Sequence, residues 1–255
     1  MPLLFDMSWE ELQAYQGTNP RPAEFDEFWE ESLREIGYID PEIEIIPASF
    51  QTPTAACLDM YFAGVGGARI HAKVVRPREA EEPHPAVLMF HGYSGSSGEW
   101  SDHLGLAAAG FTVAALDCRG QGGLSEDVGG VKGTTMRGQI VRGLDDSPEK
   151  LLFRQIFLDT AQLARIVMAM PEVDAARVGA TGRSQGGGLT LITSALRSEI
   201  KGGVSGYAFL CCFPEAMKLL RSYPYDELSC YARAYPERVP RMIETLSYYD
   251  AVNFA

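Results

Sequence analysis

Ser184 is the residue whose surroundings point most directly to chemistry. It lies in the pentapeptide GRSQG (182–186), between an apolar run and a stretch expected to form a helix. In a Gly-x-Ser-x-Gly turn the serine occupies a sharp, strained corner. Side chains in place of Gly182 and Gly186 would collide with the strand and helix. Such a serine can attack a carbonyl carbon, and the free N–H groups that begin the helix can stabilise the resulting oxyanion. The pattern predicts a nucleophile for acyl transfer.

The same stretch also fits a nucleotide-binding loop. TGRSQGGG matches the Thr-Gly-xxx-Gly-x-Gly loop of short-chain dehydrogenases, which place it after their first strand and need a Tyr-xxx-Lys pair downstream. Here the loop follows several predicted strands, and no tyrosine has a lysine four positions later. The segment GGVKGTT (129–135) lacks the Gly-Lys-Ser/Thr order of a P-loop. A nucleotide-dependent oxidoreductase is therefore the weaker hypothesis.

A second oxyanion donor should come from the loop after an earlier strand. PAVLMFHGYSG provides an apolar run followed by a His-Gly loop, so we assign the two donors to the backbone N–H groups of Tyr93 and Gln185. A third polar turn, Arg119-Gly120-Gln121, follows the apolar run FTVAALDC. Because the carboxyl ends of parallel strands meet at one edge of a sheet, these three turns are expected to lie together.

These motifs carry a family resemblance. With HGYSG and GRSQGG, the Arg-Gly-Gln turn makes the chain resemble the acetyl xylan esterase and cephalosporin-C deacetylase family of carbohydrate esterases. The similarity extends to PLLFDM and FDEFW near the start and to ETLSYYDAVNFA at the end, so it covers essentially all 255 residues. The resemblance implies an α/β-hydrolase fold, with a mostly parallel sheet covered by helices on both faces.

The resemblance also implies an activity and an assembly. The family removes acetyl groups from small sugars such as xylo-oligosaccharides and from related esters such as cephalosporin C. We expect no cofactor, and no metal because the chain has no HExxH or other metal-ligand spacing. The family forms a ring-shaped homohexamer with the active sites facing an inner cavity. The family's Arg-Gly-Gln segment braces the oxyanion loop, a role the resemblance gives to Arg119 and Gln121, with Gly120 between them. A plain structural ion pair is the alternative role for Arg119.

Ester hydrolysis further requires a base and an acid that orients it, in the chain order Ser, Asp or Glu, His. All the histidines precede Ser184; they are His71, His84, His91 and His103. His91 is the nearest substitute, although hydrogen bonds that shape its own loop are its expected role. We expect His71 to be an ordinary strand residue, and His84 and His103 to lie on the surface.

The acid is equally hard to place. Asp226 and Asp250 are expected to be capping or solvated residues. In the family the acid and its histidine would lie beyond Ala255, so we expect the C-terminal part of the α/β-hydrolase domain to be missing here. We expect the intact parent to be a serine esterase. The alternative is a non-catalytic truncated fragment or pseudoenzyme that keeps the fold but lacks the triad Asp and His.

The elements that must position these residues follow from hydrophobic periodicity. We predict a single domain over residues 1–255, with alternating strands and helices and parallel, continuously apolar strands covered on both faces. The expected elements are an N-terminal helical segment (1–40) with an amphipathic helix (23–36), a hairpin (57–64 and 69–75), helices at 101–110, 152–170 and from Ser184 to about 198, a surface excursion (124–148), and a helical cap insertion (213–250).

Composition narrows the class of protein. A net charge of −12 disfavours binding to nucleic acid or to anionic membranes. The odd count of five cysteines, without CxxC spacing, indicates free thiols in a reducing cytosol, with no disulfide framework or zinc site. The N-terminal stretch turns acidic at once and has no basic region before an apolar run, so we expect no secretory signal. No stretch approaches the roughly 20 apolar residues of a membrane helix. We therefore expect a cytoplasmic protein that acts on a small ester.

Overall fold

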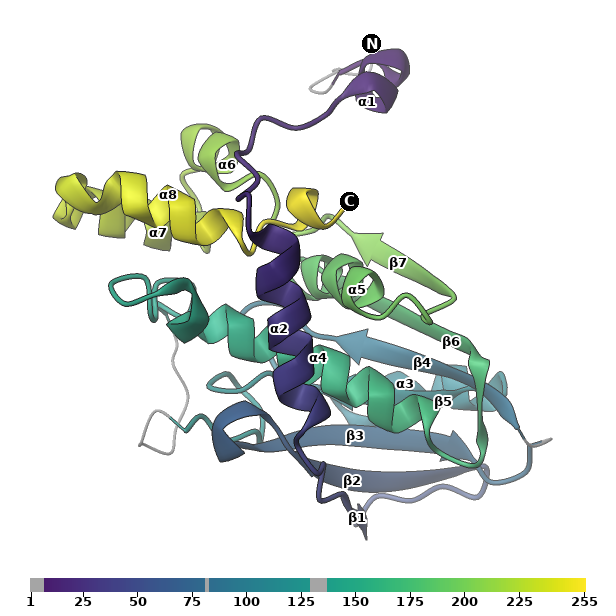
Figure 1. Cartoon of the computed structure of the whole chain (residues 1–255). Coiled ribbons are helices and arrows are strands. Elements are labelled where there is room, and N and C mark those ends of the chain that lie inside the picture. The colour runs from purple at the N-terminus through teal and green to yellow at the C-terminus, as the bar shows by residue number, and fades with distance from the viewer. Residues whose placement is uncertain (1–6, 81–82, 129–136) are drawn as a thin grey trace.

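A seven-stranded mixed sheet forms the centre of the protein, in the order β1-β2-β3-β5-β4-β6-β7 (Figure 1). The computed structural model describes residues 7–80, 83–128 and 137–255. β2, β5, β4, β6 and β7 run in one direction, and β1 and β3 run in the other. The strands are β1 (Glu44–Pro47), β2 (Ala55–Ala63), β3 (Arg69–Pro77), β4 (His84–Phe90), β5 (Thr112–Leu116), β6 (Val173–Arg183) and β7 (Gly202–Gly206).

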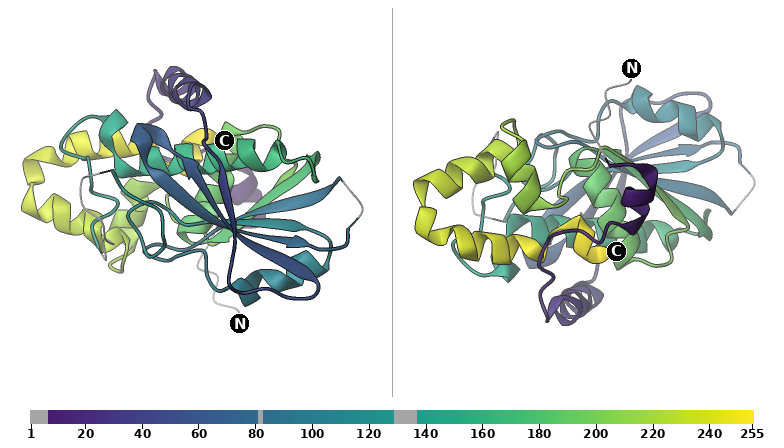
Figure 2. Two further views of the ribbon diagram at one scale, coloured as in Figure 1. Left: turned by 90° about the horizontal axis from the view of Figure 1, so that it is seen from below. Right: turned by 90° about the horizontal axis from the view of Figure 1, so that it is seen from above.

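Helices cover both faces of this sheet, as the sequence predicts (Figure 2). α3 (Trp100–Ala108) packs on one face over a small apolar core. α4 (Leu152–Met168) and α5 (Gln185–Leu196) pack on the other face, over the main core. The predicted hairpin is confirmed as the antiparallel pair of β2 and β3. The parallel strands β4, β5, β6 and β7 alternate with these helices, so their carboxyl ends point to one side of the molecule (Figure 1).

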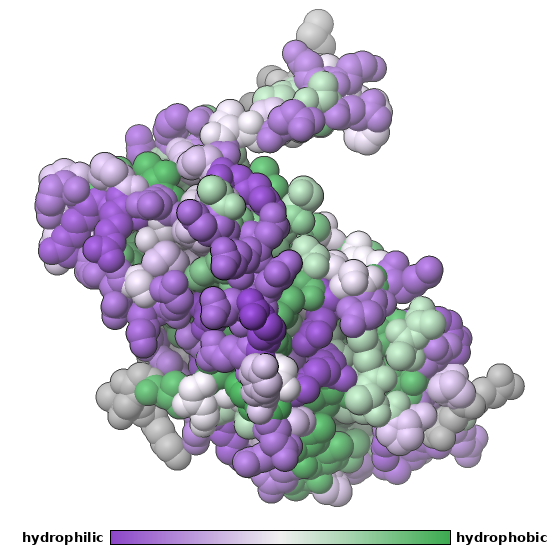
Figure 3. Space-filling view, in the orientation of Figure 1, coloured by the Kyte–Doolittle hydropathy of each residue, from purple (hydrophilic) through white to green (hydrophobic). Residues whose placement is uncertain are grey.

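The predicted amphipathic helix is α2 (Phe25–Gly37), which lies across α4 (Figure 1). Its apolar side faces inward, where the Trp29 ring stacks on Phe157 with ring centroids 5.7 Å apart. Its charged side faces outward and contributes to the mostly hydrophilic surface in this view (Figure 3). α4 is buried on nearly all sides because it lies between the sheet and α2.

Short helices gather beyond the carboxyl ends of the parallel strands (Figure 1). They fall within the range predicted to be helical, and their role as a cap stays a prediction. The helices in this group are α6 (Phe213–Leu219), α7 (Tyr225–Ala234) and α8 (Val239–Ser247), followed by a 3-10 turn (Ala251–Phe254).

A separate short helix, α1 (Trp9–Ala14), has no buried residue and stands away from the body.

The predicted surface excursion (124–148) is described only in part. Leu124–Val128 and Arg137–Ser147 contain no helix or strand. The GGVKGTT segment lies outside the described residues, as does most of the PLLFDM motif. None of the helices formed by the described residues is long and apolar enough to cross a membrane.

Two histidines predicted to lie on the surface are buried. His84 is 5% exposed because it begins β4 beside β5, and its Nε2 lies 2.8 Å from Thr112 Oγ1. His103 is 3% exposed because it lies on the inner side of α3, and its Nε2 lies 2.7 Å from the Ser97 carbonyl oxygen. The surface prediction was wrong because the Pro-rich turn ends before His84 and the sheet-facing side of α3 includes His103.

Candidate active site

Ser184 lies at the turn between β6 and α5 in a backbone conformation that non-glycine residues rarely adopt. Its φ is 55° and its ψ is −120°. A Cβ on Gly186 would collide with the Phe90 carbonyl oxygen, and a Cβ on Gly182 would lie 2.7 Å from that same oxygen. The turn passes this close to the end of β4 only because both flanking residues lack a side chain. The structure thus has the strand–turn–helix geometry that the GRSQG pattern predicts.

Backbone hydrogen bonds hold this strained turn in place. The Ser184 N–H donates to the Gly206 carbonyl at 3.0 Å, and the Ser184 carbonyl accepts from the Phe209 N–H at 2.9 Å. Both partners belong to β7 or to the segment just after it. Strain at a single residue persists only where the surroundings fix it, and such strain is concentrated at functional sites.

The loop after β4 contains the second predicted oxyanion donor, the Tyr93 N–H. The Ser94 N–H donates to Gln121 Oε1 at 2.8 Å, and the Gly95 N–H donates to the Gly92 carbonyl at 3.0 Å. The N–H groups of Tyr93 and Gln185, in contrast, have no acceptor among the described residues. Gln185 is the first residue of α5, where helix geometry leaves the N–H without an internal partner. Neither of the two predicted oxyanion donors thus has an acceptor among the described residues.

Gln121 connects the two segments that carry these donors. Its Oε1 accepts from the Ser94 N–H, and its Nε2 donates to Gln185 Oε1 at 3.0 Å. Both glutamines are buried, with 2% and 0% of their surface exposed. Because one amide side chain bonds to the loop and to the start of α5, Gln121 is placed to act as the predicted brace.

The Arg119 side chain bonds to α4 and to Val65 and not, among the described residues, to the loop that Gln121 contacts. Its guanidinium makes a bidentate ion pair with Asp159 on α4 at 2.7 and 2.6 Å, and donates to the Val65 carbonyl at 3.1 Å. Gly120, at φ +66°, provides the left-handed turn between Arg119 and Gln121. The structure shows no hydrogen bond from Arg119 to the oxyanion loop within the described residues. The ion-pair alternative therefore describes Arg119, and only Gln121 has the geometry of a brace.

His91 has both ring nitrogens engaged by backbone groups. Nδ1 lies 2.7 Å from the Gly92 carbonyl, and Nε2 accepts from the Cys118 N–H at 3.0 Å. These bonds require the neutral tautomer with the proton on Nδ1. Burial lowers the pKa of the His91 imidazole, which favours the same neutral form. His91 therefore shapes its loop, and neither nitrogen is free to take a proton from Ser184.

The other proposed acid–base groups are also engaged elsewhere. No histidine bonds to Ser184 in the part of the chain that the structure describes. Asp250 is fully buried, where it accepts from the Cys212 and Phe213 N–H groups at 2.8 and 2.9 Å. Asp226 lies 3.7 Å from Arg233 in an exposed ion pair. Asp250 is thus a capping residue, and neither carboxylate is placed as the acid of a triad by these contacts.

Asp117 is a structural centre of the site that our sequence reasoning missed. Its carboxylate accepts from the Ser97 N–H at 2.6 Å and the Leu124 N–H at 2.9 Å, and lies 2.6 Å from His71 Nδ1. His71 Nε2 lies 2.9 Å from Asp59 Oδ1, so His71 is a fully buried link between two carboxylates. The sequence signal for this role was the position of Asp117, directly after an apolar strand and two residues before Arg119.

We predict that Asp117→Asn destabilises the protein in a pH-dependent way. Burial alone would raise the pKa of the Asp117 carboxyl, but hydrogen bonds from His71 and two amides hold that pKa well below its ordinary value of 3.8. A depressed folded-state pKa stabilises the fold above pH 3.8, and this stability is lost as the pH falls further. We expect a loss of about 3 kcal/mol in unfolding free energy at pH 7.

Urea unfolding of the wild type and the variant between pH 3 and pH 7 measures this difference. The exposed Asp146→Asn serves as the matched control. The loss should shrink below pH 3.8 for Asp117→Asn alone, and a loss that is constant over this range would contradict the assignment.

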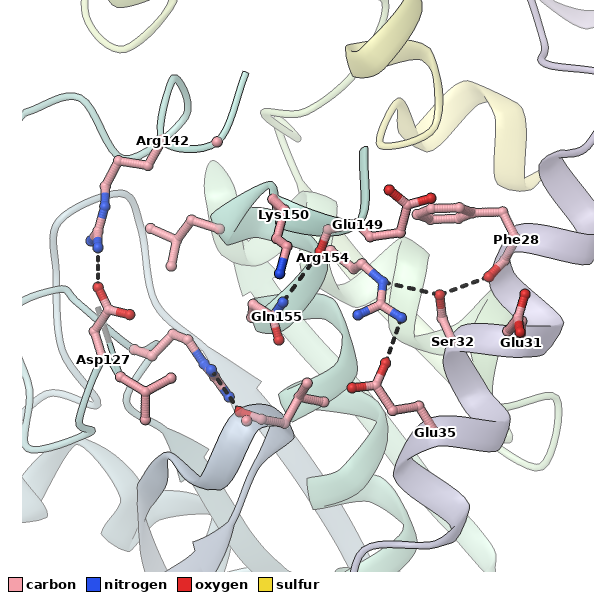
Figure 4. Close-up of a pocket in the computed structure, with 16 residues that line it drawn as sticks. Phe28, Glu31, Ser32, Glu35, Asp127, Arg142, Glu149, Lys150, Arg154 and Gln155 are labelled. Atoms are coloured by element: carbon pink, nitrogen blue, oxygen red, sulfur yellow. Dashed lines mark hydrogen bonds and ion pairs between the residues drawn. The ribbon is translucent and has the colours of Figure 1, made fainter. Parts of the chain in front are cut away.

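A cavity of about 830 Å³ lies apart from this site, between α2, α4 and residues 142–150 (Figure 4). Two ion pairs lie among its charged side chains. Arg154 bonds to Glu35 at 2.7 Å and to Ser32 at 3.1 Å, and Arg142 bonds to Asp127. Of the predicted site residues only Arg119 lines it. The cavity is therefore not the place where Ser184 would meet an ester.

The chain is similar to known proteins over its whole length. The family model for acetyl xylan esterase matches residues 1–255. The chain belongs to the acetyl xylan esterase family. Acetyl xylan esterase 1 from Thermoanaerobacterium sp. JW/SL YS485 has a crystal structure that is 52% identical with a TM-score of 0.92, covering 98% of this chain and 80% of that chain. These matches identify the fold of this family member as that of an α/β-hydrolase.

Two further proteins are similar to this chain at lower identity. Acetyl xylan esterase from Paenibacillus sp. R4 is 30% identical with a TM-score of 0.89, covering 98% of this chain and 80% of that chain. The acetyl esterase Axe7A of Xylanibacter ruminicola is 24% identical over 243 residues, which are 92% of this chain. The chain spans about half the length of that curated relative, 53%. In the described part of this family member, no cluster of three or more His, Cys, Asp or Glu side chains could hold a metal ion.

Proposed function

We propose that this protein is a serine esterase that removes acetyl groups from small acetylated sugars, such as xylo-oligosaccharides, and from related esters such as cephalosporin C. One observation carries the proposal. Ser184 occupies a turn with positive φ at the carboxyl end of β6, and the N–H groups of Tyr93 and Gln185, assigned as the oxyanion donors, have no acceptor among the described residues. Membership of the acetyl xylan esterase family supports the substrate class.

The proposed reaction proceeds in two steps. The Ser184 hydroxyl oxygen attacks the acetyl carbonyl carbon, and the Tyr93 and Gln185 amides stabilise the oxyanion. The carbon–oxygen bond to the sugar breaks, and the sugar leaves as an alcohol with the proton that Ser184 gave up. Water then attacks the acetyl-serine and releases acetate, which restores the serine hydroxyl. The four histidines are bonded elsewhere, so we assign proton transfer to none of them.

Hydrolysis of acetylated xylo-oligosaccharides and of 4-nitrophenyl acetate tests the proposal. We expect acetate release, and a brief incubation followed by acid quenching should show one acetyl group on the peptide that contains Ser184. Parallel assays with cephalosporin C and 4-nitrophenyl butyrate define the range of esters. A protein without turnover or acetylation would contradict the proposal and favour the alternative of a non-catalytic protein that keeps the fold.

We also propose that the protein acts in the cytoplasm as a ring-shaped hexamer. All five cysteines are free thiols, which supports a reducing compartment. The hexamer rests on the family resemblance, and light scattering coupled to size-exclusion chromatography measures it. A monomeric mass in solution would contradict the proposed assembly.

A further inference from the structure

The loop that carries Tyr93 is bonded to α7 as well as to Gln121. The Tyr93 hydroxyl donates to Glu227 Oε2 at 2.6 Å and accepts from the Ile140 N–H at 2.7 Å. Glu227 lies in the first turn of α7, among the helices beyond the carboxyl ends of the strands (Figure 1). The phenolic oxygen of Tyr93 thus has one donor and one acceptor, which fixes the position of its ring.

The next residue of the loop is held from the same side. Ser94 Oγ lies 2.6 Å from the Tyr223 hydroxyl and accepts from Gln139 Nε2 at 2.9 Å. The Tyr223 ring also packs edge-on against the Tyr93 ring, with centroids 5.3 Å apart. Gln121 bonds to the backbone of Ser94. Residues 93 and 94 therefore lie between Gln121 on one side and the α7 segment on the other.

The burial of the Tyr93–Glu227 hydrogen bond indicates its role. Burial and the neighbouring Glu227 raise the pKa of the Tyr93 phenol far above its usual value, so Tyr93 remains a hydrogen-bond donor. Glu227 Oε1 is buried and has no partner among the described residues. Burying a carboxylate oxygen without a partner is unfavourable, and an apolar side chain would fill the same space without that cost. Simple packing therefore does not account for a carboxylate at this position.

We propose that Glu227 is a positioning residue for the oxyanion loop, which acts through the Tyr93 hydroxyl to fix the direction of the Tyr93 N–H. This inference rests on the proposed function, because it takes that N–H as a donor to the oxyanion. Preorganised donors stabilise a transition state only when they already point at the developing charge. The segment that contains α7 is then part of the catalytic apparatus.

Kinetics of three variants test the positioning role. We expect Glu227→Ala to lower kcat for acetyl-ester hydrolysis roughly 10- to 100-fold, with KM changed by less than about 3-fold. Glu227→Gln keeps an acceptor oxygen and should recover most of the activity. Tyr93→Phe removes the same hydrogen bond from its other end, together with the bond from the Ile140 N–H, and should lower kcat at least as much as Glu227→Ala. The double variant should then lose no more than Tyr93→Phe alone, because Glu227 acts only through the Tyr93 hydroxyl.

Hydrogen–deuterium exchange provides a readout that does not depend on turnover. Glu227→Ala should increase exchange of the backbone amides in residues 91–98, whereas Asp226→Ala, a change to the exposed neighbouring carboxylate, should leave both exchange and kcat as in the wild type. Equal exchange in Glu227→Ala and the wild type, or additive losses in the double variant, would overturn the inference. An inactive wild type would overturn the proposed function instead, and the exchange comparison would still decide whether Glu227 fixes the loop.

Discussion

Replacing Ser184 with alanine should reduce acetyl-ester hydrolysis by roughly 1,000-fold or more, because the reaction loses the atom that accepts the acetyl group. The folded state should change little. Alanine removes only a hydroxyl that has no hydrogen-bond partner among the described residues, and the backbone bonds of residue 184 to Gly206 and Phe209 stay in place. We therefore expect an inactive protein whose melting temperature is close to that of the wild type.

A matched control separates loss of the nucleophile from loss of a serine in general. Ser198 is exposed and lies just beyond the end of α5, so Ser198→Ala should keep full activity. The acetylated peptide expected from the wild type should also disappear in Ser184→Ala. Unchanged turnover in Ser184→Ala would refute the assignment of the nucleophile, even if the protein proves to be an esterase.

The second large effect is expected from Gly186→Ala. The added Cβ would collide with the carbonyl oxygen of Phe90, which is backbone and cannot rotate away. β4 and the start of α5 would have to separate, and both are buried central elements. We expect a loss of about 3–5 kcal/mol in unfolding free energy, together with loss of activity, because the Ser184 turn depends on this close approach.

Gly105→Ala is the control for this substitution. Gly105 lies within α3, and nothing comes within 4 Å of a Cβ placed there. Alanine should stabilise that helix by about 0.5–1 kcal/mol. Urea unfolding of both variants measures the difference, and a Gly186→Ala protein as stable as Gly105→Ala would rule out the close packing described here.

Features encoded by neighbouring residues could be predicted from the sequence. The Ser184 turn, the β2–β3 hairpin and the inward face of α2 follow from glycine spacing and from hydrophobic periodicity, both of which act over a few residues. The same holds for the two predicted oxyanion donors, Tyr93 and Gln185, because their positions follow from the loop after β4 and from the start of α5.

Features that depend on contacts between distant segments could not be predicted in this way. His84 and His103 were expected on the surface because His84 lies next to a Pro-rich turn and His103 in a helix, yet the sheet and α3 bury them. The opposite directions of Arg119 and Gln121 depend on Asp159, which lies 40 positions after Arg119. The bond between Tyr93 and Glu227 spans 134 positions, and no local pattern indicates such a pair.

The large sequence separation of the contacts that hold the oxyanion loop affects the order in which parts of the protein fold. The bonds of residues 93 and 94 to Glu227 and Tyr223 close loops of 134 and 129 positions, and long loops close at a greater entropic cost and more slowly than local contacts. The strands and the serine turn can assemble before these loops close. A refolding chain should therefore gain a competent oxyanion loop after the strands and the serine turn have formed, so that catalytic competence reports a late docking step of the fold.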